Sequence, residues 1–314
     1  MGKLAILFPG QGSQVVGMGK ELYDSFDIAR SVIDRADAAL PVDLKKLIFE
    51  GPEEELTKTI NVQPAITAVS LATYEILKEK GVTPDVVAGH SLGEYAALYA
   101  AGALSLEDTL KLVRRRGELM HEAACASPGA MLAIVGLSLD DVSAICDEAR
   151  GDGVLNIANI NSEEQIIISG EKTRVEKAAS IAEGKEARKV VFLNVSGSWH
   201  CDLMKPAEEG MAAELSGTRI NDPAIPIIAN VTGEYENSAN EVRVNLVKQI
   251  CNPVRWARSM ERMVGDGVTD AVEAGPGKVL RGLMRKIARD VKTVSVGDIK
   301  TLDKAVEMVK GGDE

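Results

Sequence analysis

Residues 85–101 read DVVAGHSLGEYAALYAA, the most informative stretch of the chain. The apolar, β-branched run Asp85–Ala88 is typical of a short buried strand, and the small-residue run Leu92–Ala101 is typical of a buried helix. Between them lies GHSLG, a GxSxG sequence placed on a strand-to-helix turn, which is the context of a nucleophile elbow. The stretch therefore predicts an α/β fold with Ser91 exposed at the end of a strand.

The chemistry of an elbow explains these residue types. Glycines on either side of Ser91 remove Cβ atoms where backbone must approach backbone. The helix N-terminus directs amide hydrogens and positive dipole at the point where an oxyanion develops, and the Leu92 amide is the first expected donor. The alternative is a chance GxSxG match in a chain that contains 29 glycines.

Further strands and helices alternate along the chain, which favours a parallel sheet covered on both faces. We expect short buried strands at Leu4–Phe8, Ile225–Ala229, Asp270–Glu273 and Thr293–Val296. We expect helices at Pro64–Lys80, Leu106–Ala124, Val254–Val264 and Lys278–Arg289.

The middle of the chain follows another order, strand–helix–strand–strand–helix–strand. Its expected elements are Met131–Val135, Leu139–Ala149, Val154–Ile160, Gln165–Ser169, Thr173–Glu183 and Lys189–Val195. This βαββαβ order is the ferredoxin-like pattern. We therefore predict a small subdomain of residues 127–195 inserted into a large α/β domain of residues 1–126 and 196–314. A cleft between two such bodies is a common ligand site.

Composition excludes several classes of protein. The 314 residues include 36 basic and 47 acidic side chains, a formal net charge of −11, which argues against general nucleic-acid binding. The four cysteines form no CxxC pair, so neither a disulfide framework nor a zinc site is expected. The apolar run Leu4–Phe8 is too short for a signal peptide or a membrane span. We expect a cytoplasmic protein without a metal or cofactor.

A nucleophilic serine needs a base, and the chain contains only three histidines. His90 adjoins Ser91 on the elbow, so its side chain should diverge from the hydroxyl, and His121 lies near the end of a helix. His200 follows the expected strand Lys189–Val195, in a loop of the kind that often carries catalytic groups. We choose His200; a structural, partly buried histidine is the alternative.

Arg116 falls on the apolar side of its helix. Thr109, Leu112, Val113 and Met120 share that side at steps of three and four, whereas Arg114 is expected to be exposed. A buried guanidinium is costly unless it is paired, and its planar fork fits a carboxylate. The partner is either a substrate carboxylate or an internal Asp or Glu, unless the side chain reaches outward to solvent.

Two glycine-rich loops follow expected strands without matching a nucleotide motif. FPGQGSQ (8–14) has Val15 where the dinucleotide fingerprint needs its third glycine. GPGK (275–278) has Val279 where a P-loop needs Ser or Thr. Both are typical of tight turns, and Gln11 could bring a backbone or side-chain amide to the site.

Six segments in this order resemble malonyl-CoA:acyl carrier protein transacylases. They are FPGQGSQ (8–14), GHSLGE (89–94), Arg116, GSWH (197–200), QICNPVRW (249–256) and EAGPGK (273–278). The resemblance covers nearly the whole chain, and the ordered set is far more specific than GHSLGE alone.

The resemblance implies an α/β-hydrolase-like core that carries a ferredoxin-like subdomain. It implies that Ser91 takes malonyl from malonyl-CoA as an ester, with His200 as general base and then acid, while Arg116 holds the malonyl carboxylate. The acyl group would then pass to the phosphopantetheine thiol of holo acyl carrier protein, for fatty acid synthesis.

The same resemblance implies supporting roles. Backbone amides of Gln11 and Leu92 would stabilise the oxyanion, and the Gln249 carbonyl would orient His200. Three positions depart from the family pattern: Trp199 stands where Phe is common, Cys201 where Ser is common, and His121 where Gln is usual.

Two other functions remain open at this point. A serine hydrolase such as a thioesterase would use the same elbow, although no HGGG oxyanion loop occurs here. A non-catalytic module that binds carrier proteins would be favoured by degenerate catalytic residues, yet Ser91, His200 and Arg116 are all present. We expect a monomer that binds neither nucleic acid nor membrane; basic clusters at Lys185–Lys189 and Arg281–Arg289 are candidate carrier-docking surfaces.

Overall fold

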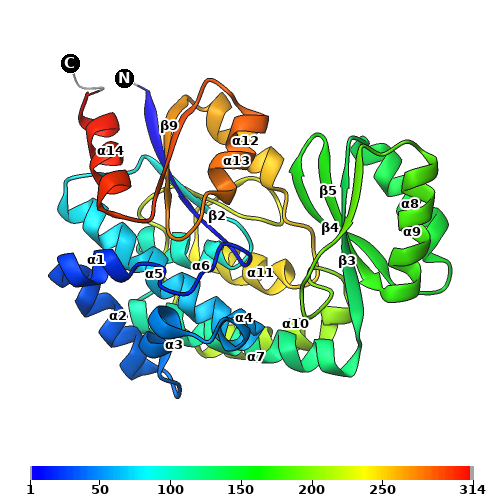
Figure 1. Ribbon diagram of the computed structural model, residues 1–314, viewed down its shortest axis with the longest axis horizontal. Helices are drawn as coiled ribbons and strands as arrows, with labels where there is room; N and C mark the ends of the chain where they lie inside the picture. Colours follow the sequence, from blue (N-terminus) through cyan, green and yellow to red (C-terminus); the bar gives the residue numbers. More distant parts are fainter. Residues whose placement is uncertain (1, 312–314) are drawn as a thin grey trace.

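The strands form two separate sheets in the computed structural model, which describes residues 2–311 (Figure 1). The larger sheet has the order β10-β9-β1-β2-β7-β8. Its strands are β1 (Lys3–Phe8), β2 (Val86–Gly89), β7 (Ile227–Ile228), β8 (Tyr235–Glu236), β9 (Val268–Ala274) and β10 (Lys292–Val296). All neighbours pair in parallel except β7 and β8. The predicted mixed α/β fold with a parallel sheet is confirmed.

Helices cover both faces of this sheet, and alternate residues of β1 show how. Ile6 and Phe8 join the larger core with α5 (Thr59–Glu79) and α6 (Gly93–Ala100). Ala5 and Leu7 face the opposite core with α12 (Trp256–Gly265) and α13 (Val279–Ile287). A strand buried on both faces has no polar alternation, which explains the continuous apolar run of β1.

The remaining helices of the large body extend the first core. They are α1 (Lys20–Ser25), α2 (Asp27–Ala39), α3 (Leu44–Glu50), α4 (Glu53–Thr57), α7 (Leu106–Ala126), α10 (Lys205–Gly217), α11 (Ala239–Gln249) and α14 (Ile299–Lys310). The 21-residue α7 begins at its N-cap Ser105, whose hydroxyl accepts a hydrogen bond from the Asp108 amide.

The second sheet belongs to the smaller body at the right of Figure 1. Its elements are β3 (Gly129–Val135), α8 (Leu139–Arg150), β4 (Leu155–Ser162), β5 (Gln165–Glu171), α9 (Lys172–Gly184) and β6 (Lys189–Phe192). The strand order is β4-β5-β3-β6, and every pair is antiparallel. Leu132 and Ile134 pack under α8 and α9, whereas Met131 and Ala133 join the core of the large body.

Several predicted element bounds differ from the structure. The expected strand at Ile225–Ala229 is only two residues long, because it pairs with β2 at one position and turns at once into β8. The expected strand Lys189–Val195 ends at Phe192, because its pairing with β3 stops there.

Arg114 is half-buried rather than exposed, and Pro64 explains why. Helix α5 begins at Thr59, five residues before the predicted start, so Pro64 lies inside it. Proline lacks the N–H that would bond to the carbonyl four residues earlier, which is Ile60. Arg114 Nη1 donates to that carbonyl at 3.1 Å and so satisfies it.

Candidate active site

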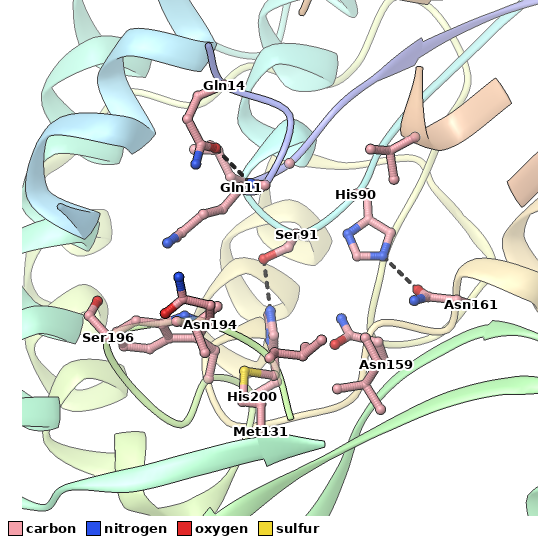
Figure 2. Close-up of a pocket in the computed structure, with 18 of the residues that line it drawn as sticks. Gln11, Gln14, His90, Ser91, Met131, Asn159, Asn161, Asn194, Ser196 and His200 are labelled. Atoms are coloured by element: carbon pink, nitrogen blue, oxygen red, sulfur yellow. Dashed lines mark hydrogen bonds between the residues drawn. The ribbon is translucent and has the colours of Figure 1, made fainter. Parts of the chain in front are cut away.

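A cavity of about 680 Å³ lies between the large body and the inner face of the small sheet (Figure 2). Loops at the carboxyl ends of β1 and β2 form one wall, and Met131 and Ile167 of the small sheet form part of another. Ligands bind at this end of parallel strands in open α/β sheets. Of the predicted site residues, this cavity is lined by Gln11, Ser91, Leu92, Arg116 and His200.

The elbow places Ser91 between β2 and α6 in a left-handed conformation, with φ of 51°. A Cβ on Gly93 would lie 2.1 Å from the Phe8 carbonyl oxygen, and a Cβ on Gly89 would lie 1.9 Å from the Gly93 backbone. Only glycine fits at either position. The two glycines therefore let the elbow press against β1, as the sequence predicts.

Ser91 and His200 point toward one another (Figure 2), with Ser91 Oγ 2.8 Å from His200 Nε2. His200 Nδ1 lies 2.8 Å from the main-chain oxygen of Gln249 at the end of α11. Because a carbonyl only accepts, Nδ1 carries the proton and Nε2 is left to accept the Ser91 proton. His200 also has a positive φ, 60°, and such backbone strain is concentrated at functional sites.

The environment of His200 keeps its imidazole neutral. Burial, with the nearby positive charge of Arg116 adding to it, lowers the pKa of His200 to about 3. A neutral imidazole is the form that accepts a proton, so His200 is in its base form near neutral pH.

Arg116 is buried beside the serine, with 1% of its surface exposed. Its Nη2 donates to Ser91 Oγ at 3.1 Å and to Gln249 Oε1 at 2.9 Å, and its Nη1 donates to Gln63 Oε1 at 2.8 Å. All three acceptors are neutral, and within residues 2–311 no carboxylate forms an ion pair with Arg116. The guanidinium therefore keeps its charge available for an anion at the nucleophile.

Two backbone amides near Ser91 are free to donate. Within residues 2–311, the N–H groups of Gln11 and Leu92 form no hydrogen bond. Gln11 lies on the loop after β1, close to the elbow in Figure 2, and both residues line the cavity. The Ser91 amide is not free, because it donates to Asn230 Oδ1 at 2.6 Å.

Three buried polar residues at the site escaped sequence reasoning. Gln63 lies next to Pro64 on α5, Glu94 in the first turn of α6, and Asn230 just after β7. The sequence does mark Glu94, because it is the only charged residue of α6. Arg116 is marked in the same way, as a charge on the apolar side of its helix. Gln63 and Asn230 are uncharged polar residues, and nothing in the surrounding sequence marks them as buried at the site.

The other histidines lie away from the nucleophile. His90 Nε2 contacts Asn161 Oδ1 at 2.9 Å, and its ring packs 5.3 Å from that of Trp256. His121 is exposed on α7 and does not line the cavity. Trp199 does line it and is nearly buried, whereas the buried Cys201 donates to the Ser198 carbonyl.

Over the described residues, 2–311, no group of three His, Cys, Asp or Glu side chains is placed to hold a metal ion. None of the helices found there is long and apolar enough to cross a membrane.

Known proteins resemble this chain over almost its full length. A family model described as an acyl transferase domain matches residues 6–308. The malonyl CoA-acyl carrier protein transacylase of Bacillus subtilis (strain 168) is 45% identical over 311 residues, covering 99% of this chain and 98% of that protein.

Solved structures agree with the sequence comparison. The acyl-carrier-protein-S-malonyltransferase from Bartonella henselae has a TM-score of 0.95 at 42% identity and covers 99% of this chain and 100% of its own. A type II PKS acyl-carrier protein in complex with its malonyl-transacylase provides a second match, with a TM-score of 0.95, 39% identity, and 98% and 99% coverage. The chain therefore belongs to the acyl transferase family, among the malonyl CoA-acyl carrier protein transacylases.

Proposed function

We propose that this protein transfers a malonyl group from malonyl-CoA to the phosphopantetheine thiol of an acyl carrier protein and so supplies fatty acid synthesis. The observation that carries the proposal is a buried Arg116, with no ion-pair partner within residues 2–311, in contact with a serine that also contacts a neutral histidine. A nucleophile with a cation 3.1 Å away suits an acyl group that ends in a carboxylate.

In the first half-reaction, Ser91 Oγ attacks the thioester carbonyl while its proton moves to His200 Nε2. The carbonyl oxygen becomes an oxyanion, and the free amides of Gln11 and Leu92 stabilise it. Collapse of this intermediate breaks the carbon–sulfur bond, and the departing coenzyme A sulfur takes the proton from His200. Malonyl is left as an ester on Ser91.

The second half-reaction reverses these steps with another thiol. The carrier thiol gives its proton to His200 and attacks the ester, and Ser91 recovers the proton as it leaves. Since one site processes two thiols of the same kind in turn, the kinetics are ping-pong. Gln249 acts through its carbonyl, which holds the His200 tautomer in place of the acidic residue of many triads.

Arg116 gives the reaction its preference for a dicarboxylic acyl group. Its hydrogen bonds would fix the malonyl carboxylate and thereby hold the thioester against Ser91. An acetyl group offers no carboxylate and would leave the buried cation without an anionic partner.

The architecture fits this assignment. We propose that residues 1–126 and 196–314 form an α/β-hydrolase-like body, and that residues 127–195 form a ferredoxin-like one. The βαββαβ order and the antiparallel strand order β4-β5-β3-β6 support the second part. We propose a cytoplasmic monomer that uses no metal or cofactor and binds neither nucleic acid nor membrane.

The proposal is tested by partition of the acyl group. The protein is given malonyl-CoA together with holo carrier protein, and malonyl-carrier and free malonate are measured over time. Transfer predicts malonyl-carrier as the main product. Free malonate as the main product, with carrier present, would identify a thioesterase instead.

A further inference from the structure

Glu94 carries a buried carboxyl group that the proposed mechanism does not use. It lies in the first turn of α6, three residues after the nucleophile, and 1% of its surface is exposed. Burial of a carboxylate is costly unless its oxygens are hydrogen-bonded. Both oxygens of Glu94 accept hydrogen bonds, from Asn230 and Gln249, which lie far from Glu94 in the sequence.

One oxygen of Glu94 is tied to the elbow through Asn230. The Asn230 backbone amide donates to Glu94 Oε1 at 3.1 Å. The Asn230 side chain accepts from the Ser91 amide at 2.6 Å and donates to the Gly89 carbonyl at 2.7 Å. Asn230 thus contacts the backbone on both sides of the turn that presents the nucleophile.

The other oxygen is tied to Gln249, which contacts the rest of the site. Gln249 Nε2 donates to Glu94 Oε2 and, at 2.9 Å, to the Ser91 carbonyl. The same amide accepts from Arg116 through Oε1, and the Gln249 main-chain oxygen meets His200 Nδ1. Every hydrogen-bonding group of this side chain therefore has a partner in the site.

We propose that Glu94 is a positioning residue for acyl transfer: its two oxygens join Asn230, which holds the Ser91 elbow, to Gln249, which holds His200 and Arg116. The inference rests on the proposed function. Glu94 touches no reacting atom and acts through the two residues that it bonds. A carboxyl group is required because each of its two oxygens must accept an N–H, which it can do whether or not it is protonated, whereas a carboxamide has only one acceptor.

The test substitution is Glu94→Gln, which keeps the shape of the side chain and removes one acceptor. Either the Asn230 amide or the Gln249 side-chain amide then faces an NH2 group, and two donors cannot bond to each other. The displaced residue must move, and with it either the Ser91 elbow or the Gln249 carbonyl that contacts His200. We expect acylation of Ser91 to slow about 10- to 100-fold, the scale of a small misplacement of reacting groups. Acylation from malonyl-CoA and acylation from acetyl-CoA should both slow, because both use the elbow and His200.

Glu236→Gln is the matched control. Glu236 is also buried, but its Oε1 accepts only from Asn245 Nδ2, at 2.8 Å, and its Oε2 has no partner within residues 2–311. A carboxamide can keep that single bond, and within residues 2–311 the Glu236 side chain forms no hydrogen bond with Asn230 or Gln249. We expect its acylation rate to stay within about twofold of the unsubstituted protein.

Rapid-quench mass spectrometry gives both the rate constant and the final fraction of acylated protein. Positioning predicts that Glu94→Gln reaches full acylation slowly. Full-rate acylation, or a normal rate in a reduced fraction of molecules, would overturn the inference, because the second result indicates only partial unfolding. If Glu94→Gln does not fold, Glu94→Asp replaces it: two acceptors set back by one methylene should also slow acylation, and an unchanged rate would overturn the inference. Failure of the unsubstituted protein to form any malonyl adduct would count against the proposed function itself.

Discussion

At the scale of single residues, Ser91 Oγ has two contacts that bear on its reactivity. Its hydroxyl meets an uncharged base on one side and a buried cation on the other. The cation lowers the proton affinity of His200. In the proposed mechanism the same side chain, Arg116, also attracts an anionic acyl group to the nucleophile.

Arg116→Ala is expected to remove the preference for malonyl. Transfer from malonyl-CoA should fall strongly, because its carboxylate loses its partner, while transfer from acetyl-CoA should be retained or improved. Single-turnover acylation with each thioester measures the ratio. A parallel fall for both substrates would refute the carboxylate contact.

His200 should remain neutral well below pH 6.5. Burial and the charge of Arg116 lower its pKa to about 3, so protonation is favoured in the unfolded chain and not in the folded one. The free energy of unfolding should therefore decrease as the pH falls from about 6.5 toward 3, because His200 binds a proton in the unfolded chain first. NMR of the imidazole nitrogens checks this, with His200→Asn identifying the signal. Titration of His200 near pH 6.5 would contradict the prediction.

At the scale of elements, the elbow depends on how closely α6 approaches β1. Gly93 is the first residue of α6, and its Cα faces the Phe8 carbonyl. The glycine does not provide a positive φ here; it provides the space that a methyl group would occupy.

Gly93→Ala is expected to destabilise the fold by at least 1–3 kcal/mol, the usual cost of overpacking, and to impair acylation. Gly184→Ala is the control, because a Cβ at the end of α9 meets nothing within 4 Å. Helix propensity favours that change by about 0.5–1 kcal/mol. Urea unfolding of both variants gives the comparison; equal stabilities would disprove the steric argument.

Much of this arrangement could be predicted from the sequence. Element types followed from periodicity, and Arg116 stood out because a charge on an apolar stripe demands a partner. Partners themselves were not predictable: Asn230 lies 139 residues from Ser91, and only tertiary packing brings them together. The roles of Ser91, His200, Gln11, Leu92 and Gln249 remain predictions, supported now by their geometry.

Arg114 shows the limit of pattern reading. Its position on α7 indicated exposure, but its side chain donates a hydrogen bond to the Ile60 carbonyl of α5, which Pro64 leaves without its helical partner. A local pattern does not reveal a hydrogen-bonding vacancy on a neighbouring element.

At the scale of the whole molecule, the two bodies enclose the site without a disulfide or metal link among the described residues. The small sheet contributes apolar residues to one wall, and the large body contributes the polar groups at its centre. Global stability therefore includes the cost of burying those polar groups.

Stability should fall as the pH rises through neutrality. Burial raises the pKa of Glu236 to about 7, and burial together with the charge of Glu236 raises that of Glu94 to about 8. Both groups are thus protonated more readily in the folded state than in the unfolded one. Their contribution to the free energy of unfolding is fully present below about pH 4.5 and is lost as the pH rises to 7–8.

The expected slope is up to about 1.4 kcal/mol per pH unit for each such proton. Urea unfolding between pH 5 and 8.5 measures it, and Glu236→Gln should flatten the curve, since it removes one of the two groups. An identical slope in that variant would show that the buried pair does not titrate as described.

Intact mass measured after brief exposure to malonyl-CoA, and again after addition of holo carrier protein, tests the central claim most directly. We predict that the protein gains one malonyl group, loses it to the carrier, and gains none when Ser91 is replaced by Ala. An adduct that survives Ser91→Ala, or the absence of any adduct on the unsubstituted protein, would contradict the account.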